Sequence, residues 1–325
     1  MKKLIQTIYA LFFTWSATIS QIIPEDSLYL GQTPPGNTPQ IFNLAVSSGS
    51  FTAERIAITP DGTEIYYSVV KKYYPTSGDT IKCYRYENNQ WNGPFNLFNN
   101  YLSPGLSKTG DTLFFENNIV PYQTMLSYKN GTGWSTPQRI LNNLNSAHYL
   151  QTVHSGNYYI SSNVSTGLGA SDWCQLFLNN TDSSAISLGK PVSNSADNLD
   201  FFIARDESYI ILAKGDLEIS FKKTDGGWTN PKKLSNEINF GAGMWAPYVS
   251  NDNKYLFYST GTLEDYSDVN VYWVKIDNLV DSLKHTNFVP YLNNLIPNQT
   301  DTIYQEFNFT IHESKIGRAS CRGRV

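Results

Sequence analysis

Three carboxylates are the candidates for catalysis in this 325-residue sequence: Glu54, Asp197 and Asp200. Each lies just before or inside a short apolar segment, and similar segments recur along the chain. Glycoside hydrolases use two or three carboxyl groups that converge on one glycosidic bond. One interpretation is therefore that the protein is a glycan-active hydrolase that uses these three carboxylates. The other interpretation is that they solvate the mouth of a channel without catalysis.

The sequence lacks the motifs of other catalytic classes. No Gly-x-Ser-x-Gly segment is present, so the nucleophile elbow of serine hydrolases is absent. The four histidines have no metal-ligand spacing. Glu264, Asp265 and Asp268 place three carboxylates in one loop, which suits Ca²⁺, although a solvated acidic loop has the same composition. Our leading expectation is a protein without catalytic residues and without a cofactor other than this Ca²⁺ candidate.

Aromatic side chains in or near predicted loops are the candidates for ligand binding, because they can stack on sugar rings or peptide side chains. They are Tyr73, Tyr74, Tyr122, Trp173, Trp245 and Tyr266. The binding candidates among them are Tyr122, Trp173, Trp245 and Tyr266.

The segment Glu54–Ser68, ERIAITPDGTEIYYS, predicts an antiparallel hairpin. Pro60 presets φ at the second position of the turn, Asp61 bonds back to the backbone, and Gly62 supplies a positive φ. The flanking runs rich in Ile and Tyr favour strands.

Weaker copies of this hairpin follow: LSKTGDTLFFE from Leu106, QTVHSGNYYIS from Gln151, IARDESYIILA from Ile203 and YVSNDNKYLFYS from Tyr248. Their turns lie about 48 residues apart, a period typical of propeller blades. Each repeat supplies two further strands, separated by Trp-x-x-Pro in three repeats. Four short strands per repeat, without a crossover helix, predict an all-β fold, a β-propeller of four-stranded blades. The starts of the first strands would bring Glu54, His148, Asp197, Asp200 and Trp245 to the central channel.

Five blades are predicted, with six as the alternative. The fifth repeat lacks a fourth strand, because Asp277–Lys284 has helical spacing of its apolar residues. The N-terminal segment Gln40–Ala45 has the sequence of a fourth strand and no blade of its own. Pairing it with the fifth repeat would close the ring and remove both sheet edges.

The strand, Pro-Asp-Gly turn and Tyr-rich strand of Ile56–Ser68, with its copies, resemble the TolB-type WD40-like propeller repeat over residues 28–284. LYLGQTPPGNTPQIF (residues 28–42) and VNVYWVKIDNLVDSLK (residues 269–284) are similar to the two ends of secreted Bacteroidetes-type proteins with this repeat. Residues 296–311 look like the first strands of a cadherin-like or immunoglobulin-like module. The resemblance implies the fold and leaves the function open.

Both ends of the chain predict segments outside the propeller. Residues 1–20 have the layout of a secretory signal peptide, with cleavage before Gln21 and a buried helix or membrane anchor as the alternative. Residues 285–314 would form a linker and the truncated module. Residues 315–325 bring three arginines into an acidic chain, which indicates a tail foreign to the natural protein rather than a native basic tail.

Composition limits the classes of partner that the protein is expected to bind. A net charge of -4 with 16% charged residues argues against nucleic acid or anionic lipid. No segment after the signal peptide is predicted to cross a membrane, and the three cysteines form no disulfide framework. We expect an exported periplasmic, outer-surface or secreted propeller that binds a protein or a glycan. A glycan-active hydrolase and a structural spacer of a longer cell-surface protein are the alternatives.

Overall fold

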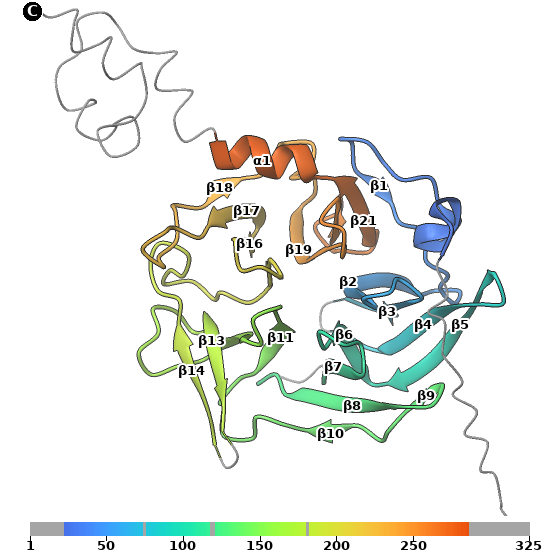
Figure 1. The fold of residues 1–325 in the computed structure, drawn as a ribbon, viewed down its shortest axis with the longest axis horizontal. Helices are drawn as coiled ribbons and strands as arrows, with labels where there is room; N and C mark the ends of the chain where they lie inside the picture. Colours follow the sequence, from blue (N-terminus) through green and yellow to red (C-terminus); the bar gives the residue numbers. More distant parts are fainter. Residues whose placement is uncertain (1–22, 74–75, 118–120, 180–181, 286–325) are drawn as a thin grey trace, which may run out of the picture. The chain divides into compact units, whose positions relative to one another are not determined.

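The computed structural model describes residues 23–73, 76–117, 121–179 and 182–285. Five antiparallel sheets are arranged in a ring (Figure 1). The first sheet contains β2 (Phe51–Ile58), β3 (Glu64–Val70), β4 (Thr80–Glu87) and β5 (Gln90–Asn99), in chain order. Each sheet is one blade, so the prediction of an all-β propeller with five blades is confirmed, and the six-blade alternative is wrong.

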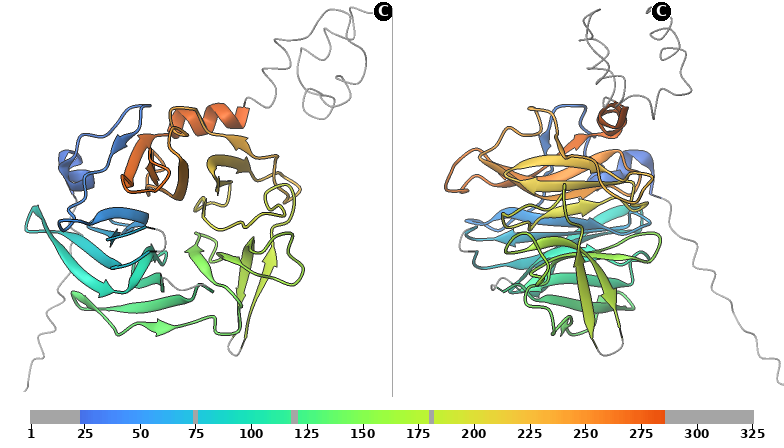
Figure 2. Two further views of the ribbon diagram at one scale, coloured as in Figure 1. Left: turned by 180° about the vertical axis from the view of Figure 1, so that it is seen from behind. Right: turned by 90° about the vertical axis from the view of Figure 1, so that its left-hand side faces the viewer.

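The remaining blades follow in sequence around the ring, and the view from behind shows the same order (Figure 2, left). The second is β6 (Tyr101–Leu106), β7 (Thr112–Asn117), β8 (Thr124–Asn130) and β10 (Gln138–Arg139), with β9 (Gly133–Trp134) beside β8. The third is β11 (His148–Thr152), β12 (Tyr158–Ser162), β13 (Asp172–Leu178) and β14 (Ser183–Ser187). The fourth is β15 (Phe201–Ile203), β16 (Tyr209–Lys214), β17 (Asp216–Phe221) and β18 (Lys232–Lys233). The fifth is β19 (Gly243–Val249), β20 (Tyr255–Gly261) and β21 (Asn270–Lys275), completed by β1 (Gln40–Ile41).

The ring closes through the N-terminal strand, as the sequence predicts. Strand β1 pairs antiparallel with β21, with Gln40 opposite Trp273 and Ile41 opposite Tyr272. A short 3₁₀ segment, η1 (Glu25–Gly31), precedes it. Because the first and last parts of the propeller share one sheet, the fifth blade has its fourth strand without a sixth repeat.

Aromatic side chains fill the space between blades. Trp134 of the second blade lies edge-on to Tyr66 of the first, with ring centroids 5.9 Å apart. Both belong to a cluster that also includes Cys83, and Cys174 lies in a separate cluster. Both thiols are free and buried on third strands of different blades, as expected of structural cysteines.

The helix predicted after the propeller is α1 (Asp277–His285). The chain divides into two compact units at its start, residues 1–277 and 278–325. Within the described residues, no helix is long and apolar enough to cross a membrane. The proposed signal peptide, the surface-protein module and the tail with Cys321 lie outside the described residues, and their boundaries stay predictions.

The first strands line the centre of the ring, where those of neighbouring blades contact one another. Four of them carry a bulge with a residue in the left-handed region: Glu54 (φ 70°), Ser103 (57°), Tyr149 (58°) and Ala246 (56°). In β6, residues 103–104 lie opposite one residue of β7, whereas in β2, residues 54–56 lie opposite Tyr67 alone. Bulges redirect side chains, and the longer one brings Glu54 and Arg55 together at the centre.

Candidate functional site

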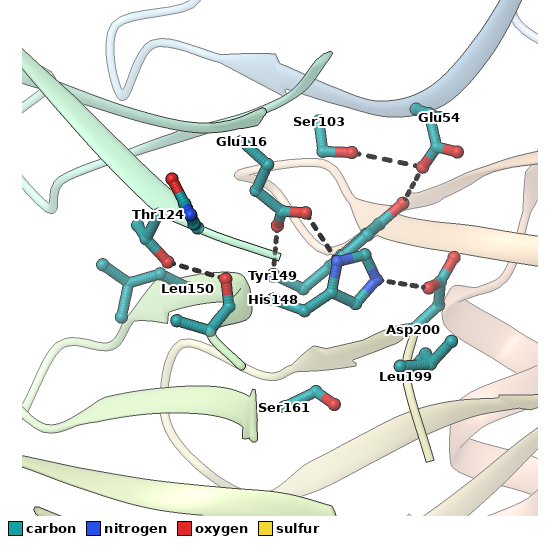
Figure 3. A network of polar contacts seen from close by, with 12 residues as sticks. Glu54, Ser103, Glu116, Thr124, His148, Tyr149, Leu150, Ser161, Leu199 and Asp200 are labelled. Carbon is teal, nitrogen blue, oxygen red and sulfur yellow. Dashed lines mark hydrogen bonds and ion pairs between the residues drawn. The ribbon is translucent and has the colours of Figure 1, made fainter. Parts of the chain in front are cut away.

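A cluster of ionisable side chains occupies the channel at the level of these bulges (Figure 3). Its centre is His148, at the start of β11. The Nδ1 atom of His148 lies 2.5 Å from Oε2 of Glu116 on β7, and Nε2 lies 2.9 Å from Oδ1 of Asp200, which immediately precedes β15. Burial opposes charging of the imidazole, but the two carboxylates outweigh it and raise the pKa of His148 to about 10. The ring is therefore a cation at neutral pH.

Glu54 forms the second part of the cluster. Its Oε2 accepts hydrogen bonds from the hydroxyls of Ser103, at 3.2 Å, and Tyr149. Burial, together with the negative charge of Asp200, raises the pKa of Glu54 to about 7. Glu54 is thus able to exist as an acid or as a carboxylate near neutral pH.

Arg55 lies next to these groups and is only 2% exposed. Its Nε donates to Pro104 O at 3.1 Å, and its Nη2 donates to the carbonyls of Ser103 and Leu150. The guanidinium carbon is 4.6 Å from the centre of the Tyr149 ring. Burial lowers the pKa of Arg55, and the nearby carboxylates oppose this effect.

The cluster is continuous with a belt of polar contacts that joins every blade to the next. The contacts are Ser103 N–H to Ser68 Oγ (3.0 Å), Tyr149 N–H to Glu116 Oε1, Ser161 Oγ to Asn198 O (2.6 Å), Ala246 N–H to Asp200 Oδ2 (3.0 Å) and Ser259 Oγ to Glu54 O (3.1 Å). Buried polar groups need such partners, so part of the role of the cluster is to hold the ring together.

Aromatic rings from three loops and one strand border the cluster. Tyr122 stacks on the His148 ring with centroids 4.3 Å apart. Tyr73 stacks on Trp245 at 4.6 Å, and Tyr266 lies edge-on to both. Tyr73, Tyr122 and Tyr266 are partly exposed, and Trp245 is 8% exposed. These four residues and Asp200 form what we call the aromatic mouth of the channel.

The structure brings together some of the predicted site residues and separates others. Glu54 and Asp200 belong to the same cluster, and Tyr122, Trp245 and Tyr266 border it. Asp197 is exposed, and its negative charge acts on Tyr122 at the border of the cluster. Trp173, expected in or near a loop with a ring open to ligands, lies at the start of β13 with no exposed area, and its indole donates to Leu199 O at 3.2 Å. Tyr74 lies outside the described residues.

The acidic loop uses its carboxylates locally. Asp265 accepts hydrogen bonds from the backbone and hydroxyl of Ser267, and Asp268 accepts from Thr262 and from the backbone of Leu263. Glu264 is exposed. Among the described residues, no group of three or more His, Cys, Asp or Glu side chains is arranged to hold a metal ion.

Glu116 is the residue that the sequence reasoning missed. It is 1% exposed, and it occupies the position at which the second strands of three other blades place a buried serine: Ser68, Ser161 and Ser259. An alignment of the second strands of four repeats would have identified it, because Tyr-Tyr-Ser, Tyr-Ile-Ser and Phe-Tyr-Ser correspond to Phe-Phe-Glu. A carboxylate in place of a serine in a buried repeat position indicates a charged partner nearby.

No family model matches the sequence, and no curated protein matches it. Solved structures similar to this chain include TolB from Acinetobacter baumannii, at 14% identity over 67% of this chain and 53% of that chain, with a TM-score of 0.45. A GH43_1 enzyme from Xanthomonas citri is 10% identical over 72% of this chain and 91% of its own, with a TM-score of 0.47. The Cps50 (Swd1) β-propeller domain from Myceliophteria thermophila is 10% identical over 67% and 64%, with a TM-score of 0.40.

Proposed function

We propose that the protein is an exported propeller that binds a glycan at the aromatic mouth of its channel. The supporting observation is the combination of partly exposed tyrosines with the Asp200 carboxylate at one end of the ring. Aromatic rings supply flat apolar faces for sugar rings, and Asp200, held by His148 and the Ala246 N–H, keeps the groups around the rings in place. The loops that carry the tyrosines are joined to inner strands whose bulges are held by the belt between blades.

Recognition fits the surroundings of the carboxylates better than catalysis does. Both oxygens of Asp200 already accept hydrogen bonds, from His148 and from the Ala246 N–H. Both oxygens of Glu116 are likewise occupied, by His148 and the Tyr149 N–H. Groups committed to the protein in this way hold a site in shape, and a ligand meets the partly exposed rings first.

Binding of glycan and peptidoglycan fragments to the purified protein tests this proposal. We expect Tyr122→Ala to weaken a bound fragment at least about fivefold, because a stacked ring contributes roughly 1 kcal/mol beyond its buried area. Tyr128→Ala is the matched control, since Tyr128 is 51% exposed on β8 and is not part of the mouth. The proposal would be contradicted if a fragment bound both variants with the same affinity. It would also be contradicted if the protein bound none of the fragments.

Hydrolysis of the bound glycan is the second candidate function, and Glu54 favours it. An acid with a pKa of about 7 beside a hydrogen-bonded carboxylate is the pairing that glycoside hydrolases use, with Glu54 as the general acid and Asp200 as the second carboxyl group. The Glu54 acid would give its proton to the leaving oxygen, so the rate should fall as pH rises through 7.

Turnover assays run beside the binding screen distinguish the two functions. Glu54→Gln keeps the hydrogen-bonding shape but cannot donate a proton, so it should abolish hydrolysis and retain binding. Binding without turnover in the unmodified protein would leave recognition as the function. Turnover that survives both Glu54→Gln and Asp200→Asn would place any chemistry elsewhere.

A further inference from the structure

A cavity of about 230 Å³ lies at the other end of the channel, where the five turns between first and second strands meet. Every turn contributes to its wall: Pro60, Lys108, His154, Arg205 and Asn251. Arg55 also lines it, on the side toward the bulges. We call this the hairpin cavity, and it is distinct from the aromatic mouth because none of the mouth residues lines it.

Three cations line the hairpin cavity, and their hydrogen bonds go to neutral oxygens. Lys108 Nζ donates to His154 O at 2.9 Å. Arg205 donates to the carbonyls of Val249 and Ser250 and to the Tyr248 hydroxyl, at 3.0–3.2 Å. Arg55 bonds three carbonyls, and its Nη1 is buried with no hydrogen-bond partner. No carboxylate of the described residues lines the cavity.

The acidic residues of the turns lie outside the wall of the cavity, and the carboxyl group of each accepts hydrogen bonds at its own turn or a neighbouring one. Asp61 accepts from Thr63, Asp111 from Ser107 and Thr112, Asp206 from Ser208, Glu207 from Ser155, Asn157 and Tyr159, and Asp252 from Ser250 and Lys254. The carboxylates that compensate Arg55 are Glu54, Glu116 and Asp200, on the side of the bulges. The cavity therefore has a positive lining with room for an anion.

We propose that the hairpin cavity binds a small organic anion through its carboxylate or phosphate group, held by Lys108, Arg205 and Arg55. Guanidinium groups present paired donors that match both oxyanions, and Lys108 adds a mobile point charge. The apolar wall formed by Ile58, Leu106 and Phe202 would cover the carbon skeleton of the ligand. This site is independent of the glycan proposed for the aromatic mouth.

Calorimetric titration of the full chain at low ionic strength tests the proposal. The probes are inorganic phosphate, a hexose phosphate and a hexuronate, with the uncharged hexose as the ligand control. We expect one or more of the charged probes to bind, the uncharged hexose not to bind, and added salt to weaken binding. The charged probe that binds more tightly identifies phosphate or carboxylate as the preferred group.

Two variants place the binding in the cavity. Lys108 is exposed on a turn, so Lys108→Glu should fold normally and weaken anion binding at least tenfold. Arg205→Gln should have a similar effect. Lys190→Gln is the matched control, because Lys190 is exposed and does not line the cavity, and it should leave the affinity unchanged. The proposal would be overturned if the folded protein bound none of the charged probes. Equal affinities of Lys108→Glu and the control for a charged probe would also overturn it.

Discussion

The two ends of the channel use the same five inner strands and carry opposite charges. At the bulges, Glu54, Glu116 and Asp200 surround His148 beneath aromatic rings. At the turns, Lys108 and Arg205 line a cavity that has no carboxylate in the described residues. Arg55 lies between them, because it lines the cavity while its charge interacts with the carboxylates.

The comparison shows how a repeated backbone acquires two different sites. Four of the five blades place residues at a bulge of the first strand, and every blade places one residue at the end of the second strand and one or two at the turn. Where these residues are serine, the blades are joined by neutral hydrogen bonds, as at Ser68 and Ser259. Where one is Glu116, the joint becomes charged and requires His148. A few substitutions in equivalent positions therefore decide the polarity of each end.

The largest effect on stability is expected from Arg55→Met. The change removes the only described cation shared by the two ends and leaves three buried carbonyls without their donor. The free energy of unfolding should fall by about 3–5 kcal/mol, the usual cost of removing one member of a buried charged network. Denaturant titration measures it. Arg139→Met, at an exposed position on β10, is the control and should change stability by less than about 0.5 kcal/mol. A small loss in Arg55→Met would mean that the two ends are not coupled through this residue.

Glu116→Ser tests how much the charge adds to the contact between the second and third blades. The variant carries serine, the residue that three other blades have at the equivalent position. His148 would keep Asp200 as its partner and lose Glu116, so we expect a loss of about 2–4 kcal/mol. Ser161→Ala, which removes a neutral hydrogen bond of the same belt, should cost about 1 kcal/mol. Equal losses in the two variants would show that charge adds nothing to this joint.

Between about pH 5 and pH 8, the pH dependence of stability reports on Glu54 and His148 at the bulge end. Glu54 and His148 both have raised pKa values in the folded protein, to about 7 and about 10 from 4.5 and 6.5. A raised pKa stabilises the fold below the unfolded value, and this contribution is lost as pH rises through the folded value. The stabilising contribution of Glu54 should thus be lost as pH rises from about 4.5 to 7, and that of His148 as pH rises from about 6.5 to 10.

Melting temperatures of the unmodified protein and Glu54→Gln, measured from pH 5 to pH 8, test this sign. The difference in stability between the two should shift in favour of the variant as pH rises toward 7 and then level off. A constant difference across this range would mean that Glu54 titrates near its ordinary value.

The smallest effect on stability is expected at the hairpin end. Lys108→Gln removes an exposed side chain whose one described hydrogen bond goes to the His154 carbonyl, so the free energy of unfolding should change by less than about 0.5 kcal/mol. Anion binding should weaken all the same. A loss above 1 kcal/mol by denaturant titration would show that this cation has a structural role, as Arg55 does.

The fold was predictable because its signals are local. The turn Pro60-Asp61-Gly62 and its copies fix hairpins, and their regular spacing fixes the blades. The absence of a fourth strand in the last repeat and the strand-like segment Gln40–Ala45 predicted the closure, which β1 and β21 make through Gln40 and Ile41. The polar members of the site were predictable in part, since Glu54, His148 and Asp200 stand at the starts of first strands. Trp173 was misplaced because local sequence does not report its contact with Leu199.

By itself, the sequence determined the number of repeats and the strands in each, since periodicity and turn chemistry act over a few residues. Only the tertiary structure decided which side chains meet. Glu116 and Asp200 are 84 positions apart in number, yet both contact the His148 ring. Arg55, within the three-residue bulge of β2, lies between the carboxylates of the mouth and the hairpin cavity. Such contacts depend on the register of distant strands and on the closure of the ring, and neither is encoded within a single repeat.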